Sequence, residues 1–332
     1  MNAKEQIKRD LTNYANSKNL DIKVAIENIL SVAPTATLEE YHEYPDVIKA
    51  WLVLQVIDQT YLAYYSSESL GEFIYDTRMF QVGYNCLRYK PSCKYPVYIP
   101  DGCISTYDMF AGMKLPEDFS FAEDFDTSAI TNMRAMFHKC KFPAKFMLPS
   151  KFDTGNVTNM SYMFADCKMP EGFTLGDKFD TSNVTNMQGM FAFCEMPNSF
   201  TLGDKFDTSK VTDMRDMFTE CEFPEGFTLG NKFNTSNVTD MAAMFEDCVM
   251  PDGFTLGDKF NTQSVIDMSF MFSGCTMSDG FTLGENFITK NITNFDYMFY
   301  LSDFYYKHRD MLAVELIQKY RHEKWRKDSE SR

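Results

Sequence analysis

A phrase of 27 residues recurs along most of this chain and constrains its fold more than any other feature. One copy begins at Phe179 and reads FDTSNVTNMQGMFAFCEMPNSFTLGDK, and the next copy, FDTSKVTDMRDMFTECEFPEGFTLGNK, follows without a break. A Met-Phe pair returns at this interval eight times, from Met109-Phe110 to Met298-Phe299. A repeat length kept this strictly is typical of one structural unit stacked on copies of itself.

Two hydrophobic periods alternate inside each repeat. The first follows the i, i+3, i+4, i+7 spacing of a helix face, after an Asn or Asp placed to cap the helix, as in Asn159, Met160, Met163, Phe164 and Cys167. In the second, Phe173 and Leu175 alternate with small polar residues, which is the period of a short strand. Asp180 is expected to start a turn by accepting a backbone N–H two residues on. We therefore predict an α/β solenoid: a leucine-rich-repeat-like, parallel, right-handed stack of about eight 27-residue strand-turn-helix coils.

The regions on either side of the repeats lack this phrase. Residues 1–97 read mostly as helix, although residues 66–97 are aromatic-rich and show no clear period. The predicted organisation is a helical N-terminal domain (1–97), the repeat solenoid (98–302), and a C-terminal capping helix with a basic tail (303–332). Met311, Leu312, Val314, Leu316 and Ile317 are the apolar residues expected to cover the last coil.

Charge and hydropathy limit the partners of the chain. The formal net charge is -15, and the acidic excess belongs to the repeats, so the surface repels nucleic acid and anionic membrane. We expect a protein partner, with basic and nucleic-acid-binding proteins left open, and oligomerisation is left open as well. The first residues contain no apolar run of a signal peptide or membrane span. A cytoplasmic location is therefore expected, with the cell surface and the virion as alternatives.

Six of the nine cysteines recur at the repeat interval: Cys140, Cys167, Cys194, Cys221, Cys248 and Cys275. Equivalent residues of stacked coils are close enough for disulfides. Each Cys nevertheless occupies an apolar position, which favours buried thiols in a reducing compartment. No second Cys or His accompanies them, so we expect neither a metal nor a cofactor.

The repeat phrase also carries a resemblance to a known family. The run FDTSNVTNMSYMFADC is similar to the repeat of BspA-like leucine-rich-repeat surface proteins, specifically the Mycoplasma-type lipoprotein repeat F-[DN]-T-S-N-V-T-[ND]-M-x-x-M-F-x-x-C. The similarity covers about residues 100–302. It implies a parallel leucine-rich-repeat-like solenoid used for binding, often to host or cell surfaces. The first residues of this sequence do not show the family's lipoprotein signal, so we do not expect the surface anchoring that the resemblance would imply.

No pattern in the sequence indicates catalysis. The four histidines are isolated, and no nucleophile elbow, phosphate-binding loop or zinc spacing occurs. We therefore expect no catalytic residues and predict that the protein is not an enzyme. A rank of threonines, including Thr174, Thr201 and Thr228, is compatible with ice or sugar binding, but exposed strand positions explain it better.

Recognition is instead expected at the helix positions that change from coil to coil. The early coils offer Arg134, His138, Lys139 and Asp166 there, and exposed aromatic side chains beside charges are typical of interfaces. The predicted partner-binding residues are Tyr162, Phe193, Arg215, Asp216, Glu220, Glu246, Asp247, Phe270, Tyr297 and Tyr300. The predicted function is a non-catalytic protein-binding scaffold. An acidic, nucleic-acid-mimicking inhibitor encoded by a phage or virus, and a surface adhesin or capsid or envelope component, are left as alternatives.

Overall fold

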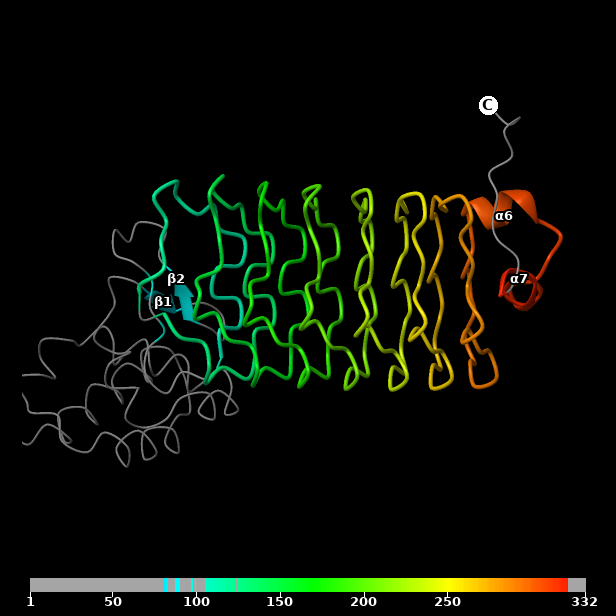
Figure 1. Cartoon of the computed structure of the whole chain (residues 1–332), viewed down its shortest axis with the longest axis horizontal. Helices are drawn as coiled ribbons and strands as arrows, with labels where there is room; N and C mark the ends of the chain where they lie inside the picture. Colours follow the sequence, from blue (N-terminus) through cyan, green and yellow to red (C-terminus); the bar gives the residue numbers. More distant parts are fainter. Residues whose placement is uncertain are drawn as a thin grey trace, which may run out of the picture.

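The computed structural model describes residues 80–82, 87–89, 97, 99, 105–123 and 125–321. The repeats lie side by side as successive coils, from a hairpin at one end of the stack to two helices at the other (Figure 1). The hairpin pairs β1 (Phe80–Val82) with β2 (Leu87–Tyr89) in antiparallel register. It falls in the stretch for which the sequence showed no clear period, and the helices predicted before it lie outside the described residues.

Two ladders of parallel backbone bridges join each coil to the next. The first, here the Asn/Asp ladder, runs through Ser105, Asn132, Asn159, Asn186, Asp213, Asp240, Asp267 and Asn294. The second, the Lys/Glu ladder, runs through Lys114, Lys141, Lys168, Glu195, Glu222, Val249 and Thr276. Every bridge of these two ladders joins residues 27 apart, so the coils keep one register along the stack.

Between the ladders, each coil contributes an eight-residue turn segment such as 160–167. Alternate N–H groups cross to the next coil: that of Tyr162 donates to the Gln188 oxygen at 2.7 Å, and that of Phe164 donates to the Met190 oxygen at 3.0 Å. The N–H of Met163 instead donates three residues back, to the Met160 oxygen at 3.1 Å. The segment is therefore a series of turns that are bonded to their neighbours.

The prediction of a two-turn helix in each coil is wrong. Tyr162 and Asp166 have φ values of 56° and 57°, which a right-handed helix does not allow. Eight residues are too few to offset the cost of starting a helix, whereas the adjacent coil offers a carbonyl to every second N–H. The predicted inward face is nevertheless correct, because Met160, Met163 and Phe164 are fully buried.

The predicted strand at Phe173 and Leu175 does not form. Both side chains are buried, as their alternation predicted, but no bridge forms at this stretch. Phenylalanine rings of adjacent coils lie 5.5–5.9 Å apart beneath these turn segments (Phe137, Phe164 and Phe191). At the equivalents of Phe173 in later coils, the ring spacing is 6.4 Å, between Phe200 and Phe227. The coils are thus wider apart where the strand was expected.

Buried polar side chains complete the bonding between coils. Thr154 and Thr181 are fully buried, and the hydroxyl of each donates to a carbonyl of the next coil at 2.8 Å. The Asp180 carboxylate accepts the N–H of Ser182 at 2.9 Å, which confirms the predicted turn. All six repeated cysteines are buried thiols, and the Cys167 thiol donates to the Phe137 oxygen at 2.9 Å.

Two helices lie at the C-terminal end, α6 (Asp303–Lys307) and α7 (Ala313–Tyr320), in place of the single capping helix predicted. Phe304 is fully buried, with its ring 5.2 Å from that of Phe299 in the last coil. Ile317 is buried as expected, whereas Leu312 is 68% exposed. Among the described residues, no helix has the length and apolar character needed to cross a membrane.

Candidate partner-binding face

The outward positions of the turn segments form one face of the stack. They are the second, third, sixth and seventh residues after each Asn/Asp ladder residue, and we call them the variable face. After Asn159 they are Ser161, Tyr162, Ala165 and Asp166. All thirteen non-glycine positive φ angles of the described residues lie at the third or seventh residue after a ladder residue. A positive φ costs about 1–2 kcal/mol for a residue with a Cβ. The N–H bond to the next coil offsets part of that cost, at about 0.5–1.5 kcal/mol.

All ten predicted partner-binding residues lie on this face. Six are exposed: Phe193, Glu220, Asp247, Phe270, Tyr297 and Tyr300. The other four are half-buried: Tyr162, Arg215, Asp216 and Glu246. Repetition therefore brings together side chains that are far apart in the sequence, although the structure by itself does not assign them a partner.

The second coil is the basic part of the variable face. The Arg134 guanidinium lies 5.6 Å from the centre of the Tyr107 ring, and the Lys139 ammonium lies 3.8 Å from the Asp166 carboxylate. Burial lowers the pKa of His138, and the charge of Lys139 lowers it further. A neutral imidazole at neutral pH follows.

Tyr162 lies over a glycine of the next coil. A Cβ built on Gly189 would lie 2.4 Å from Cε1 of the Tyr162 ring. The φ of Gly189 is 57°, close to the 54° of Ala243 at the equivalent position, so the backbone alone does not require glycine. Gly189 instead leaves space for the ring, whose burial raises the pKa of Tyr162.

Arg215 is engaged within the chain rather than free for a partner. Its guanidinium lies 2.8 Å from an oxygen of Asp213 and 3.3 Å from an oxygen of Asp240. Those carboxylates are consecutive members of the Asn/Asp ladder and would otherwise repel each other. Arg215 therefore stabilises the framework beneath the face on which it lies.

Four acidic side chains follow Arg215 along the face: Asp216, Glu220, Glu246 and Asp247. Burial raises the pKa of Glu246, and the nearby charges of Asp247, Asp216 and Glu220 raise it further. Within the described part of the chain, no ion pair involves Glu220, Glu246 or Asp247. This stretch consequently presents uncompensated negative charge.

The last two coils present a chain of aromatic rings. Phe270 stacks on Tyr297 with the ring centres 5.1 Å apart, and Tyr297 meets Tyr300 edge to face at 5.6 Å. The three side chains are 37%, 60% and 42% exposed. Tyr300 also contacts Tyr305 of α6 at 5.4 Å, a continuation that the sequence analysis missed because the repeat has ended there.

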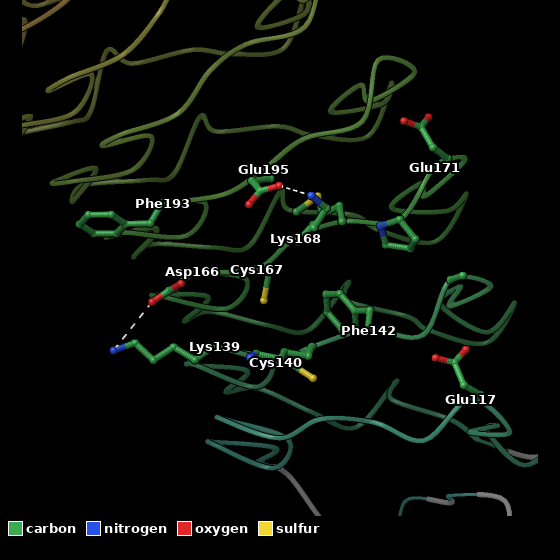
Figure 2. A pocket seen from close by; sticks show the side chains of 14 residues that line it. Glu117, Lys139, Cys140, Phe142, Asp166, Cys167, Lys168, Glu171, Phe193 and Glu195 are labelled. Carbon is green, nitrogen blue, oxygen red and sulfur yellow. Dashed lines mark hydrogen bonds and ion pairs between the residues drawn. The ribbon is translucent and has the colours of Figure 1, made fainter.

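A groove lies along the Lys/Glu ladder at the edge of the variable face (Figure 2). Its volume is about 1010 Å³, and its lining includes Lys139, Asp166 and Phe193 of the face. Lys168 and Glu195 of the ladder form an ion pair across it (Figure 2). The sequence analysis missed this edge because the ladder positions become neighbours only when the coils stack.

The chemistry available in the groove is limited. Cys140 and Cys167 belong to its lining, but burial raises the pKa of the Cys167 thiol to about 12, which keeps it protonated at neutral pH. A protonated thiol is a poor nucleophile and a poor metal ligand. The described residues contain no group of three or more His, Cys, Asp or Glu side chains placed to hold a metal ion.

Comparison with known proteins gives one match. Residues 104–223 and 228–321 match a family model described as "Mycoplasma protein of unknown function, DUF285". No curated protein and no solved structure matches the chain.

Proposed function

Because the chain belongs to this Mycoplasma repeat family, whose function is unknown, we propose a function from the surface of the chain itself. The protein is a non-catalytic scaffold that binds a partner protein through the variable face. The repeat region serves as a parallel solenoid, in the general manner of leucine-rich repeats, whose stacked coils offer an extended binding surface.

The observation that supports this function most is the run of exposed aromatic rings at Phe270, Tyr297 and Tyr300. Exposed aromatic side chains are frequent anchors of protein interfaces, because they bury a large area at a small cost in side-chain entropy. The uncompensated acidic side chains beside them favour a partner with basic residues. The resemblance to BspA-like surface proteins also supports a binding role.

Affinity capture with the tagged chain tests this function. Replacing Tyr162, Phe193 and Phe270 together by Ala is expected to abolish capture of the partner identified by mass spectrometry. The melting temperature should fall only slightly, because Phe193 and Phe270 are exposed and Tyr162 is half-buried.

A matched control lies on another side of the same coils. Thr174, Thr201 and Thr228 are exposed and invariant from coil to coil, so their replacement by Ala should leave capture intact. Capture that survives the aromatic substitutions, or that is lost in the threonine variant, would contradict the proposed face.

An acidic inhibitor of a nucleic-acid-binding protein is the second candidate. The net charge of -15 and the unpaired carboxylates at Glu220, Glu246 and Asp247 favour it. Capture by such an inhibitor would weaken steeply with salt and would be competed by DNA or RNA. An adhesin, or a capsid or envelope component, would instead bind surfaces or self-assemble. The cytoplasmic location expected from the sequence stays a prediction.

A further inference from the structure

The Lys/Glu ladder separates its charges by sign along the stack. Lys114, Lys141 and Lys168 occupy three consecutive coils, and Glu195 and Glu222 occupy the next two. All five side chains are exposed, and those of Lys168 and Glu195 are 77% and 69% exposed. The charge of the ladder side chains therefore changes from positive to negative once, between the third and fourth coils.

This order is unfavourable within a single chain. Of the four contacts between neighbours in the series, three join like charges and only the contact of Lys168 with Glu195 joins opposite charges. Like charges directly opposite each other on paired strands are destabilising. Alternating Lys and Glu would remove that cost, so stability of the single chain does not account for the pattern.

A column of side chains whose charge changes sign between Lys168 and Glu195 is complementary to an inverted copy of itself about that point. We propose that two copies of the chain associate antiparallel along this ladder, about a two-fold axis between Lys168 and Glu195. Lys168 then faces Glu195 of the second copy, and Lys141 faces Glu222 of the second copy. Interfaces of this kind use the same patch on both subunits.

One pair of residues in the neighbouring column of the variable face is also complementary in charge about this axis. Lys139 lies in the second coil and Glu220 in the fifth, at equal distances from the proposed axis, so each faces the other across the dimer. The groove lies beside the axis, and Phe193 on its rim, which is 49% exposed, becomes covered (Figure 2). The Lys139–Glu220 pairing and the covering of Phe193 are thus both compatible with the proposed two-fold axis.

The dimer leaves the proposed partner-binding aromatic run free. In this register the first six coils of the two copies face each other, and the seventh and eighth coils lie outside those six. Phe270 and Tyr297 lie in those two coils. The aromatic run therefore lies outside the dimer contact, whereas Phe193 and Glu220 belong to both proposals, so capture is tested independently of the dimer by variants at Phe270, Tyr297 and Tyr300.

Sedimentation velocity of the full-length chain over a range of concentrations tests the dimer. At low ionic strength a dimer is expected, and added salt should dissociate it because its contacts are exposed charge pairs. Lys141→Glu and Glu222→Lys should each raise the dissociation constant on the order of tenfold, because each change puts two like-charge contacts into the interface. A chain that stays monomeric at low salt overturns the proposal.

The combined variant Lys141→Glu/Glu222→Lys gives the sharper result. It should restore wild-type dimerisation, because the two exchanged charges again face each other between copies. Within one chain the two residues are three coils apart, about 14 Å, so they cannot pair directly. Dimerisation that is not restored places the interface elsewhere and overturns the proposal.

Two controls exclude indirect effects. Lys205→Glu makes the same charge change at an exposed position outside the ladder and should leave dimerisation unchanged. Lys141→Glu also creates alternating signs with Lys114 and Lys168 in the single chain, so its melting temperature should not fall. Loss of the dimer in the Lys205 variant would show a response to net charge alone and contradict the interface.

Discussion

Replacing Asp216 by glycine and by alanine tests whether this position has the turn backbone of the structure or the helix that the sequence suggested. Asp216 has a φ of 56°, and its N–H donates to the Ala242 oxygen of the next coil at 2.9 Å. Both variants lose the same carboxylate. The difference between their free energies of unfolding therefore reports only the effect of a Cβ at this backbone conformation.

The two backbones predict opposite signs for that difference. A left-handed φ costs alanine about 1–2 kcal/mol. Glycine loses more conformational entropy on folding, and this favours the alanine variant by about 0.4–1 kcal/mol. Asp216→Gly is thus expected to be more stable than Asp216→Ala by about 1 kcal/mol. In a helix, alanine would be the more stable by about 0.5–1 kcal/mol.

Urea denaturation followed by circular dichroism measures this difference on the full-length chain. The curves of the two variants should have the same slope, because their folded and unfolded states expose similar surface. An alanine variant that is more stable by 0.5 kcal/mol or more, at about the precision of the method, would refute the left-handed turn at Asp216.

Three further outcomes follow from the packing and the charges. Phe218→Ala should lower the free energy of unfolding by about 3–5 kcal/mol in urea denaturation, because its ring stacks between two buried neighbours at 5.7–5.8 Å. Gly189→Ala should cost about 1–3 kcal/mol through its clash with the Tyr162 ring, and much less in a Tyr162→Ala background; equal costs would exclude the clash. Glu246→Gln should raise the melting temperature at neutral pH, because the raised pKa of Glu246 means that its ionised form is disfavoured in the folded chain. That gain should vanish as the pH falls and the wild-type side chain becomes protonated, and a gain independent of pH would exclude charge repulsion as its cause.

The sequence predicted which side chains are buried better than it predicted the backbone that buries them. Met163 and Phe164 are repeated apolar residues, and both are fully buried. Their spacing fits one face of a helix and equally fits successive turns. The choice depends on whether the N–H of a residue such as Tyr162 bonds within its own coil or to the next coil. No local period contains that information.

The candidate face was predictable in its position but not in its internal contacts. Positions that vary while their neighbours repeat were expected at the surface, and Phe193 and Tyr297 are exposed there. The role of Arg215 depends on Asp240, which is brought beside it only by stacking. The sign reversal of the Lys/Glu ladder was likewise hidden, because its members are separated by a full repeat.

The central claim is that repeated residues build the coil and non-repeated residues carry recognition. Exchanging the outward residues of one coil for those of another tests this claim directly. Giving the sixth coil the residues of the fourth requires Ala242→Gln, Ala243→Gly, Glu246→Ala and Asp247→Phe. Each new residue already occupies the equivalent backbone position in the fourth coil, at Gln188, Gly189, Ala192 and Phe193.

The measurement is partner capture by the exchanged chain, compared with its melting temperature. The account predicts a melting temperature within about 4 °C of the wild type and a loss of capture, because the framework is kept while the acidic pair is removed. Undiminished capture, or a chain that no longer folds, would contradict it.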